Sequence, residues 1–205
     1  MRLVKRKRQP AKEGAPRRAD AQRNMQTLLK AALAVFARSG VDAPVRDIAE
    51  TAGVGVGTVY RHFPQRSDLI VAVFRQEVDA CADAAAELAA KYPPVEALSR
   101  WMQRFVEFVA AKRGLATALH SGDPAYEPLP AYYDAKLRPA LEALLKKAVA
   151  AGDIRSGAAP GDLLSAAVSL CRPAYDVAPG HTRRMIALLI DGLRFGAPET
   201  KAPKR

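Results

Sequence analysis

Apolar residues recur every three or four positions along most of this chain, and this spacing restricts its fold more than any other feature. The pattern begins at Met25, Leu29, Leu33 and Phe36 and continues in further stripes toward the C-terminus. Side chains at this spacing share one face of an α-helix, whereas a half-buried strand needs strict alternation. The sequence contains no alternating run of β-branched residues bounded by turns. We therefore expect an all-α protein of about nine helices.

Glycine and proline separate the expected helices. Gly40, Pro64, Gly152 and the pair Pro93-Pro94 each end or interrupt a helical stripe, and the proline pair marks the strongest break. The expected helices lie at about residues 25–39, 45–52, 56–63, 68–90, 98–109, 131–151, 162–177 and 181–195, with a short segment at 114–120 and a loop at 121–130.

The composition is that of a globular protein. Of the 205 residues, 49% are hydrophobic and 26% are charged. Cys81 and Cys171 are too few for a disulfide framework or a four-ligand zinc site, and they fit a reducing compartment. No apolar run approaches the ~18 residues of a membrane span, and no apolar segment follows the basic N-terminus as in a secretory signal. We expect a cytoplasmic protein with no metal, no cofactor and no membrane partner.

The formal net charge of +11 is concentrated at the two ends of the chain. Residues 1–18 hold eight basic side chains against Glu13, whereas residues 19–80 hold seven basic and seven acidic ones. Such an excess indicates a polyanionic partner. Residues 1–20 and 198–205 lack apolar periodicity, so we expect them to be flexible. The basic arm, including Arg17 and Arg18, either contacts DNA phosphates or a minor groove, or acts as a solubilising tail.

Residues 44–63 have the pattern of a helix-turn-helix motif. Two short helical segments flank Gly53-Val54-Gly55, and a turn this tight needs at least one residue with positive φ. The apolar seam between the helices is expected to comprise Ile48, Ala49, Val54, Val59 and Phe63. With this seam buried, the small residues at the start of the second helix are left free to approach the floor of a DNA groove.

Motifs for other chemistries are missing from the sequence or are in the wrong context. The run Gly53 to Gly57 suggests a dinucleotide-binding loop, but position 58 is Thr and a helix, not a strand, precedes it. His62, His120 and His181 are far apart in sequence, and no HExxH, P-loop or GxSxG motif occurs. We therefore expect a protein that is not an enzyme.

The segment VRDIAETAGVGVGTVYRHFPQRSDLI (45–70), preceded by LLKAALAVFARSG (28–40), resembles the N-terminal domain of TetR-type transcriptional regulators. The resemblance covers about residues 21–81, and ALLIDGLRFGA (187–197) resembles the last helix of many members. It implies a three-helix DNA-binding domain at 21–81. It also implies a helical bundle at 82–197 that binds an effector and forms the dimer.

The resemblance further implies a homodimer that represses transcription on a palindromic double-stranded DNA operator until a small molecule, here unknown, binds. Base contacts are expected from the start of the second motif helix, and phosphate contacts from residues on and after it. Pro44 stands where many members have Ser or Thr, so the usual hydroxyl contact is absent. The implied DNA-binding residues, besides Arg17 and Arg18, are Arg46, Val56, Gly57, Thr58, Tyr60, Arg61, His62 and Arg66.

Two further sets of residues belong to the C-terminal region. The aromatic and polar residues expected to line an effector pocket, or else to form core and surface loop, are Trp101, Met102, Phe105, Phe108, His120, Tyr126, Tyr133, Cys171 and Tyr175. The apolar stripes expected to pair across a two-fold axis, or else to be buried within one subunit, comprise Leu163, Leu164, Ala167, Leu170, Ile186, Leu189, Ile190 and Leu193.

Two other functions compete with the regulator hypothesis. A helical-bundle ligand carrier or enzyme without DNA binding would need a convergent set of titratable groups, which the sequence does not display. A basic protein of membrane surfaces would need a helix that combines a strong apolar face with a lysine-rich one, and no such helix is apparent.

Overall fold

The structure is a computed structural model that describes residues 14–111, 115–171 and 180–195, all of them helix, turn or loop. The elements are α1 (Gly14–Ser39), α2 (Val45–Ala52), α3 (Val56–His62), α4 (Arg66–Lys91), α5 (Pro94–Ala111), α6 (Ala116–Leu119), η2 (Pro124–Tyr126), α7 (Leu129–Ala150), α8 (Pro160–Leu170) and α9 (His181–Arg194). The expected all-α fold of about nine helices is confirmed within these ranges.

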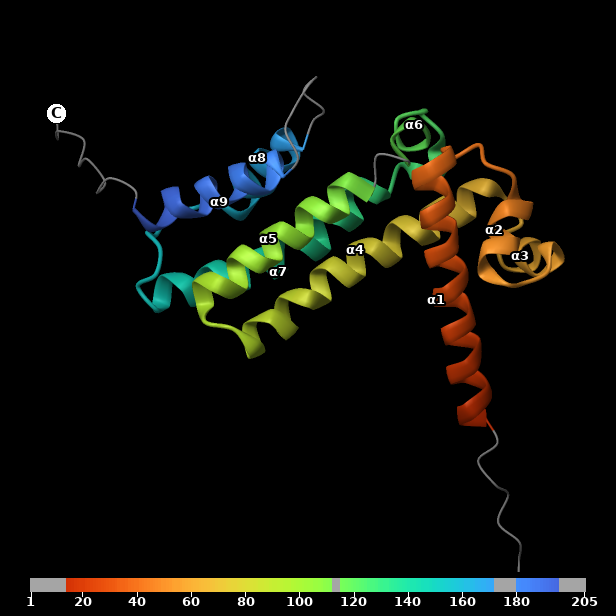
Figure 1. The fold of residues 1–205 in the computed structure, drawn as a ribbon, viewed down its shortest axis with the longest axis horizontal. Helices are drawn as coiled ribbons and strands as arrows, with labels where there is room; N and C mark the ends of the chain where they lie inside the picture. Colours follow the sequence, from red (N-terminus) through yellow and green to blue (C-terminus); the bar gives the residue numbers. More distant parts are fainter. Residues whose placement is uncertain (1–13, 112–114, 172–179, 196–205) are drawn as a thin grey trace, which may run out of the picture.

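The helix-turn-helix domain lies at one end of the molecule (Figure 1). There α1 crosses α4, and the short helices α2 and α3 lie beside both. Their shared core includes Phe36 on α1, Ile48 on α2, Val59 on α3 and Ile70 on α4, each at most 1% exposed. Two helices of seven and eight residues cannot bury much surface alone, so α1 and α4 supply the support that holds them in place.

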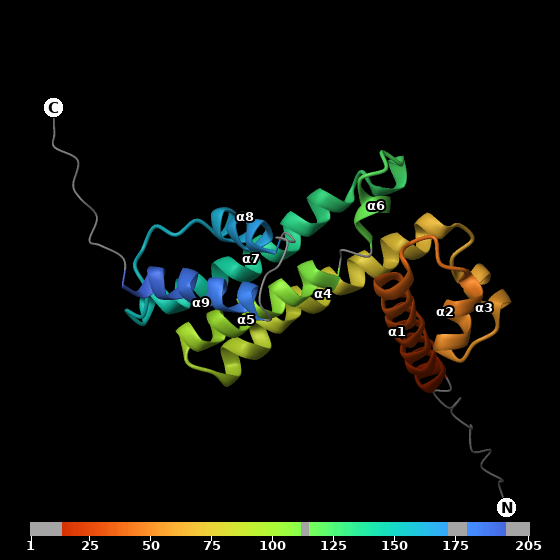
Figure 2. The same cartoon turned by 45° about the horizontal axis from the view of Figure 1, so that its top comes forward.

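Helix α4 extends through both halves of the protein. Its N-terminal part packs against α1 and its remaining length against α5 and α7, as Figures 1 and 2 show. The boundary expected at residue 81 therefore falls inside a continuous helix of 26 residues. The physical reason is the sequence of α4, which has neither glycine nor proline between Arg66 and Lys91.

The C-terminal bundle is built on α5 and α7, which run alongside α4 (Figure 2). Helix α8 packs against α7, and α9 packs against α5. The interior is filled by leucines that repeat at helical spacing on α7, namely Leu137, Leu141 and Leu144, and by Leu98 of α5, all of them buried. None of the described helices combines the length and the hydropathy that a membrane crossing requires.

Several element boundaries differ from the sequence predictions; helix α5, for example, begins at Pro94 and not near residue 98. Helix α1 begins at Gly14, so residues 14–20 of the expected flexible arm are helical, with Pro16 tolerated in the first turn. Helix α7 begins at Leu129, with Pro130 at its start, and the expected loop before it contains the 3₁₀ turn η2, where Asp123 accepts a hydrogen bond of 2.8 Å from the Ala125 amide. Helix α8 ends at Leu170, and residues 172–177 of its expected range lie outside the described residues.

Candidate functional site

The turn between α2 and α3 depends on Gly53. This residue caps α2 in the left-handed conformation with φ +69°, and its amide donates to the Glu50 carbonyl at 3.1 Å. The next amide, that of Val54, donates to the Ala49 carbonyl at 2.9 Å. A Cβ at Gly53 would meet no atom within 4 Å. Glycine is therefore needed for its backbone conformation and not for space.

The seam between the two motif helices is buried as the sequence predicts. Ile48, Ala49 and Val59 are at most 2% exposed, while Val54 and Phe63 are half-buried against the same core. Because the apolar sides of α2 and α3 face the core, their polar sides face solvent.

The solvent-facing side of α3 carries most of the predicted DNA-binding residues. Tyr60 is 53% exposed and Val56 38%; Gly57, Arg61 and His62 are exposed, and Thr58 is half-buried. Arg61 folds back along the helix, with Nε donating to the Gly57 carbonyl at 3.2 Å. Arg46 is exposed on α2. Arg17 and Arg18 lie in the first two turns of α1, and their side chains are outside the described part of the structure.

Arg66 differs from the other predicted phosphate contacts. Its guanidinium Nη1 donates to the carbonyls of Val41 and Ala43, the latter at 2.9 Å. These carbonyls belong to the loop between α1 and α2, so Arg66 ties the start of α4 to the entry of the motif. The two N–H donors of Nη1 are thus used within the protein, and they hold the loop before α2 in place. A phosphate contact by Arg66 stays a prediction.

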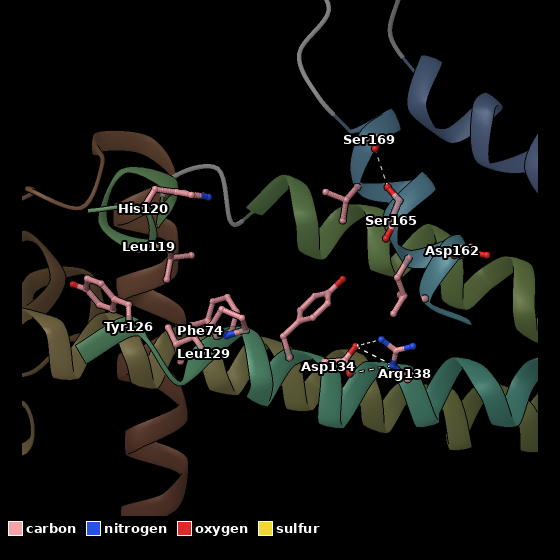
Figure 3. A pocket seen from close by; sticks show the side chains of 15 residues that line it. Phe74, Leu119, His120, Tyr126, Leu129, Asp134, Arg138, Asp162, Ser165 and Ser169 are labelled. Carbon is pink, nitrogen blue, oxygen red and sulfur yellow. Dashed lines mark hydrogen bonds and ion pairs between the residues drawn. The ribbon is translucent and has the colours of Figure 1, made fainter. Parts of the chain in front are cut away.

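A cavity of about 750 Å³ lies between α4, α7, α8 and the segment that contains α6 and η2 (Figure 3). One part of its wall is apolar and aromatic, with Phe74, Leu119, Tyr126, Leu129 and Tyr133. Burial raises the pKa of the Tyr126 and Tyr133 phenols above the ordinary value, an effect that the positive charge of Arg66 partly offsets at Tyr126.

The opposite part of the cavity is polar. Arg138 binds Asp134 one turn earlier on α7, with N–O distances of 2.6 and 3.0 Å, and this hydrogen bonding lowers the pKa of the Asp134 carboxyl. The guanidinium packs on Gly161 of α8, where a Cβ would lie 2.9 Å from Nη1. Asp162 and Ser165 complete this end, together with Ser169, whose hydroxyl donates to the Ser165 carbonyl at 2.9 Å.

Comparison with known proteins identifies both halves of the chain. Residues 28–73 match the model for bacterial regulatory proteins of the tetR family, and residues 93–195 match that of the SbtR-like transcriptional regulator C-terminal domain. The second match alone spans half of the chain. This protein belongs to the TetR family of bacterial transcriptional regulators.

Solved structures of other TetR regulators share the fold over nearly their full length. The chain is 38% identical to the TetR regulator SCO0520 from Streptomyces coelicolor, with a TM-score of 0.71 and coverage of 84% of this chain and 99% of that one. A TetR regulatory protein from Mycobacterium vanbaalenii is 35% identical, with a TM-score of 0.69 and coverage of 88% and 100%. An HTH-type regulator of Staphylococcus aureus is 38% identical over 63 residues, which are 30% of this chain and 34% of that protein.

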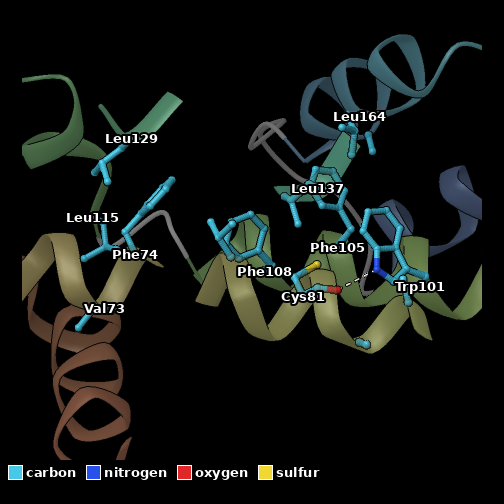
Figure 4. Close-up of a cluster of buried hydrophobic side chains, with 14 of the residues drawn as sticks. Val73, Phe74, Cys81, Trp101, Phe105, Phe108, Leu115, Leu129, Leu137 and Leu164 are labelled. Atoms are coloured by element: carbon cyan, nitrogen blue, oxygen red, sulfur yellow. Dashed lines mark hydrogen bonds between the residues drawn. The ribbon is translucent and has the colours of Figure 1, made fainter. Parts of the chain in front are cut away.

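In this TetR-family regulator, three of the residues expected in the effector pocket line the cavity: His120, Tyr126 and Tyr133. Trp101, Met102 and Phe105 do not line it, because they are fully buried in the bundle core (Figure 4). The Trp101 indole donates to the Cys81 carbonyl at 2.8 Å and stacks on Phe105 at 5.7 Å between ring centres.

The remaining pocket predictions fall elsewhere. Phe108 lines a smaller recess of about 220 Å³ beside Cys81, where burial raises the pKa of that thiol to about 12. Cys171 is buried and is not part of the cavity wall, and Tyr175 lies outside the described residues.

Most residues predicted to pair across a dimer axis are instead buried within the single chain. Leu163, Leu164, Ala167, Ile186, Ile190 and Leu193 are at most 5% exposed, and Leu170 and Leu189 are half-buried. The reason is that α8 and α9 turn their regular apolar stripes inward, onto α7 and α5. The apolar side chains that they leave exposed are Val168 (41%), Leu188 (62%) and Phe195, just after α9 (77%).

Sequence reasoning missed Phe74 and the polar end of the cavity. The available signals were spacings of three or four residues, which put Asp134 beside Arg138 on one helix, and Asp162, Ser165 and Ser169 on one face of another. These spacings also occur on ordinary solvent-facing helices, so they could not by themselves indicate a cavity.

Proposed function

We propose that this regulator is a repressor that binds a palindromic operator as a homodimer and releases it when a small molecule enters the cavity between α4, α7 and α8. The observation that carries the proposal is that one helix serves both sites. Phe74 of α4 lines the cavity, and Arg66, two turns earlier on α4, holds the loop before α2. A shift of α4 on ligand binding therefore changes the position of the helix-turn-helix motif.

On the DNA side, the proposal places α3 in the major groove. Val56 and Gly57 bring a small, exposed surface to the start of this helix, where base edges are met. Tyr60, His62 and Arg46 surround that surface and are suited to phosphate contacts. Val56 and Gly57 offer no side-chain hydrogen bonds to base edges. We therefore propose that discrimination between DNA sequences also depends on Arg46 and on the N-terminal arm with Arg17 and Arg18.

The dimer is proposed to use the outer side of α9 and the residue just after it. Leu188 and Phe195 are large apolar side chains exposed there, and a second copy of the chain would remove them from water. Dimerisation sets the distance between two α3 helices, which must be about 34 Å to enter successive major grooves. A coupling free energy of only ~1–3 kcal/mol between ligand binding and DNA binding then changes the affinity for the operator by about 5- to 150-fold.

The proposal is tested by selecting bound duplexes from a random pool with the full chain, followed by measuring affinity against salt concentration. We expect an inverted-repeat sequence and an affinity that falls steeply with salt. Tyr60→Ala should weaken binding about tenfold, and Tyr60→Phe is the matched variant that removes the hydroxyl but keeps the ring. Wild-type affinity in Tyr60→Ala would refute the assigned interface, and failure to select any duplex would favour a ligand carrier.

The dimer is tested separately by sedimentation of Leu188→Asp. A charge at this position should shift the protein toward monomer and weaken operator binding, whereas Glu87→Gln, an exposed change on α4, should leave the dimer intact. A Leu188→Asp protein that remains dimeric would place the interface elsewhere.

A further inference from the structure

We propose that the cavity between α4, α7 and α8 accepts an aromatic or polycyclic cation, namely a flat apolar body that carries one basic nitrogen. This inference rests on the proposed function of the cavity as the effector site and adds the chemical class of the effector. It is carried by the charges and ring systems that face the cavity from its two walls.

The first observation is the charge of the polar wall. In the described ranges, the residues lining the cavity include two carboxylates, Asp134 and Asp162, and one permanently charged cation, Arg138. Arg138 forms an ion pair with Asp134, to which its Nε and Nη2 donate hydrogen bonds of 2.6 to 3.0 Å. Among the described residues, the Asp162 side chain makes neither a hydrogen bond nor an ion pair, although its charge acts on Arg138 from a distance. Two carboxylates therefore face one guanidinium at this wall, which leaves an excess of one negative charge.

The second observation is the donor and acceptor pattern of α8. Asp162, Ser165 and Ser169 are three and four residues apart on α8, and all three belong to the lining of the cavity. Ser169 already donates its proton to the Ser165 carbonyl. The carboxylate accepts hydrogen bonds, and the serine oxygens keep acceptor capacity. This face therefore suits a ligand that donates N–H groups.

The third observation is the aromatic wall across the cavity. Phe74, Tyr126 and Tyr133 line it with Leu119 and Leu129. Aromatic rings provide stacking surfaces for a flat ligand, and their negative faces attract cations. His120 lies at the end of the cavity opposite Asp162 (Figure 3). A volume of about 750 Å³ falls within the range of pockets for drug-sized molecules, which matches a ligand of several fused rings.

The same geometry disfavours an anionic ligand. A carboxylate or phosphate would find Nε and Nη2 of Arg138 already bound to Asp134 and would lie beside the Asp162 charge. Arg138 is also held in place against Gly161, where a Cβ would come within 2.9 Å of its Nη1. The guanidinium is thus held between α7 and α8, with Nε and Nη2 bound to Asp134.

The inference is tested with two xanthene dyes of similar shape and opposite charge, the cation rhodamine 123 and the anion fluorescein. Fluorescence anisotropy is measured on the full chain without DNA, because DNA itself binds cationic dyes. We expect saturable binding of rhodamine 123 and affinity for fluorescein weaker by about fivefold or more. Asp162→Asn should weaken rhodamine binding about two- to fivefold, as expected for a partly exposed ion pair. Asp162→Lys should reverse the preference between the dyes.

Glu87→Gln is the matched control, since it removes an exposed carboxylate of α4 that does not line the cavity. Thermal unfolding checks that each variant is folded. Stronger binding of fluorescein, no saturable binding of rhodamine 123, or unchanged binding by Asp162→Asn would each overturn the inference. These outcomes are separate from a failure of the proposed function, which would appear as the absence of duplex binding whatever the dyes do.

Discussion

Helix α4 contributes to two different kinds of site. At its N-terminal end, the helix-turn-helix motif is built from residues close together in sequence, and a single left-handed residue, Gly53, sets the angle between α2 and α3. Farther along, the cavity is built from four separate segments, from Phe74 on α4 to Ser169 on α8. The proposed DNA surface therefore depends on local backbone geometry, whereas the proposed ligand site depends on how helices distant in sequence pack together.

The largest expected effect tests whether the helix-turn-helix domain and the C-terminal bundle unfold as one cooperative unit. Trp101→Ala removes a fully buried ring that stacks on Phe105 and bonds to α4 through the Cys81 carbonyl, and should lower the free energy of unfolding by about 3–5 kcal/mol. Trp101→Phe keeps much of the volume and should cost less. Urea unfolding followed by circular dichroism should show one transition. A two-step curve with an unchanged N-terminal step would mean that α4 does not couple the regions.

A second prediction tests whether Arg66 acts by positioning or by contact with DNA. Arg66→Ala removes the two hydrogen bonds to the loop before α2, and duplex affinity should fall about tenfold because the motif is less firmly held. The salt dependence of binding should keep its slope, since no phosphate contact is lost. A slope reduced by about one would instead support the phosphate contact implied by the family resemblance.

A third prediction concerns the turn itself. Gly53→Ala should destabilise the protein by about 1–2 kcal/mol, because alanine at φ +69° is strained even though its Cβ meets no neighbour. Gly53→Asn is the control and should cost less, since asparagine tolerates this conformation. Thermal unfolding of the three proteins gives the comparison. Equal stability of Gly53→Ala and wild type would show that the turn adopts another conformation in solution.

The smallest effect is expected at the polar wall of the cavity. Arg138 lowers the pKa of Asp134 by hydrogen bonding, so the stabilisation from this pair is complete above the unfolded-state pKa of about 4 and disappears as pH falls through the lower folded-state pKa. Both side chains are about half exposed, which keeps the effect small. Melting temperatures of wild type and Asp134→Asn should differ near pH 7 and converge toward pH 2. A constant difference would argue against the ion pair.

Two alternatives that the sequence leaves open show the limit of local patterns. The stripe from Ile186 to Leu193 is apolar, but a stripe does not indicate whether it faces its own chain or a second copy; in the structure it packs inward on α5. Similarly, the sequence allows Trp101 and Phe105 to line a ligand pocket or to fill the core, and in the structure they are buried in the core. Both alternatives concern which neighbour covers an apolar face, and this depends on the packing of the whole bundle.

The sequence alone determined the helices, the turn at Gly53 and the exposed start of α3, because each depends on backbone preferences and spacings within a few residues. Three facts could be known only from the tertiary structure. Arg66 donates to carbonyls in the loop before α2, and Phe74 lines the same cavity as Asp162. On α9, Leu188 is exposed and Ile186 is buried. These facts come from contacts between helices distant in sequence, where many arrangements satisfy the same periodicity and only close packing selects one.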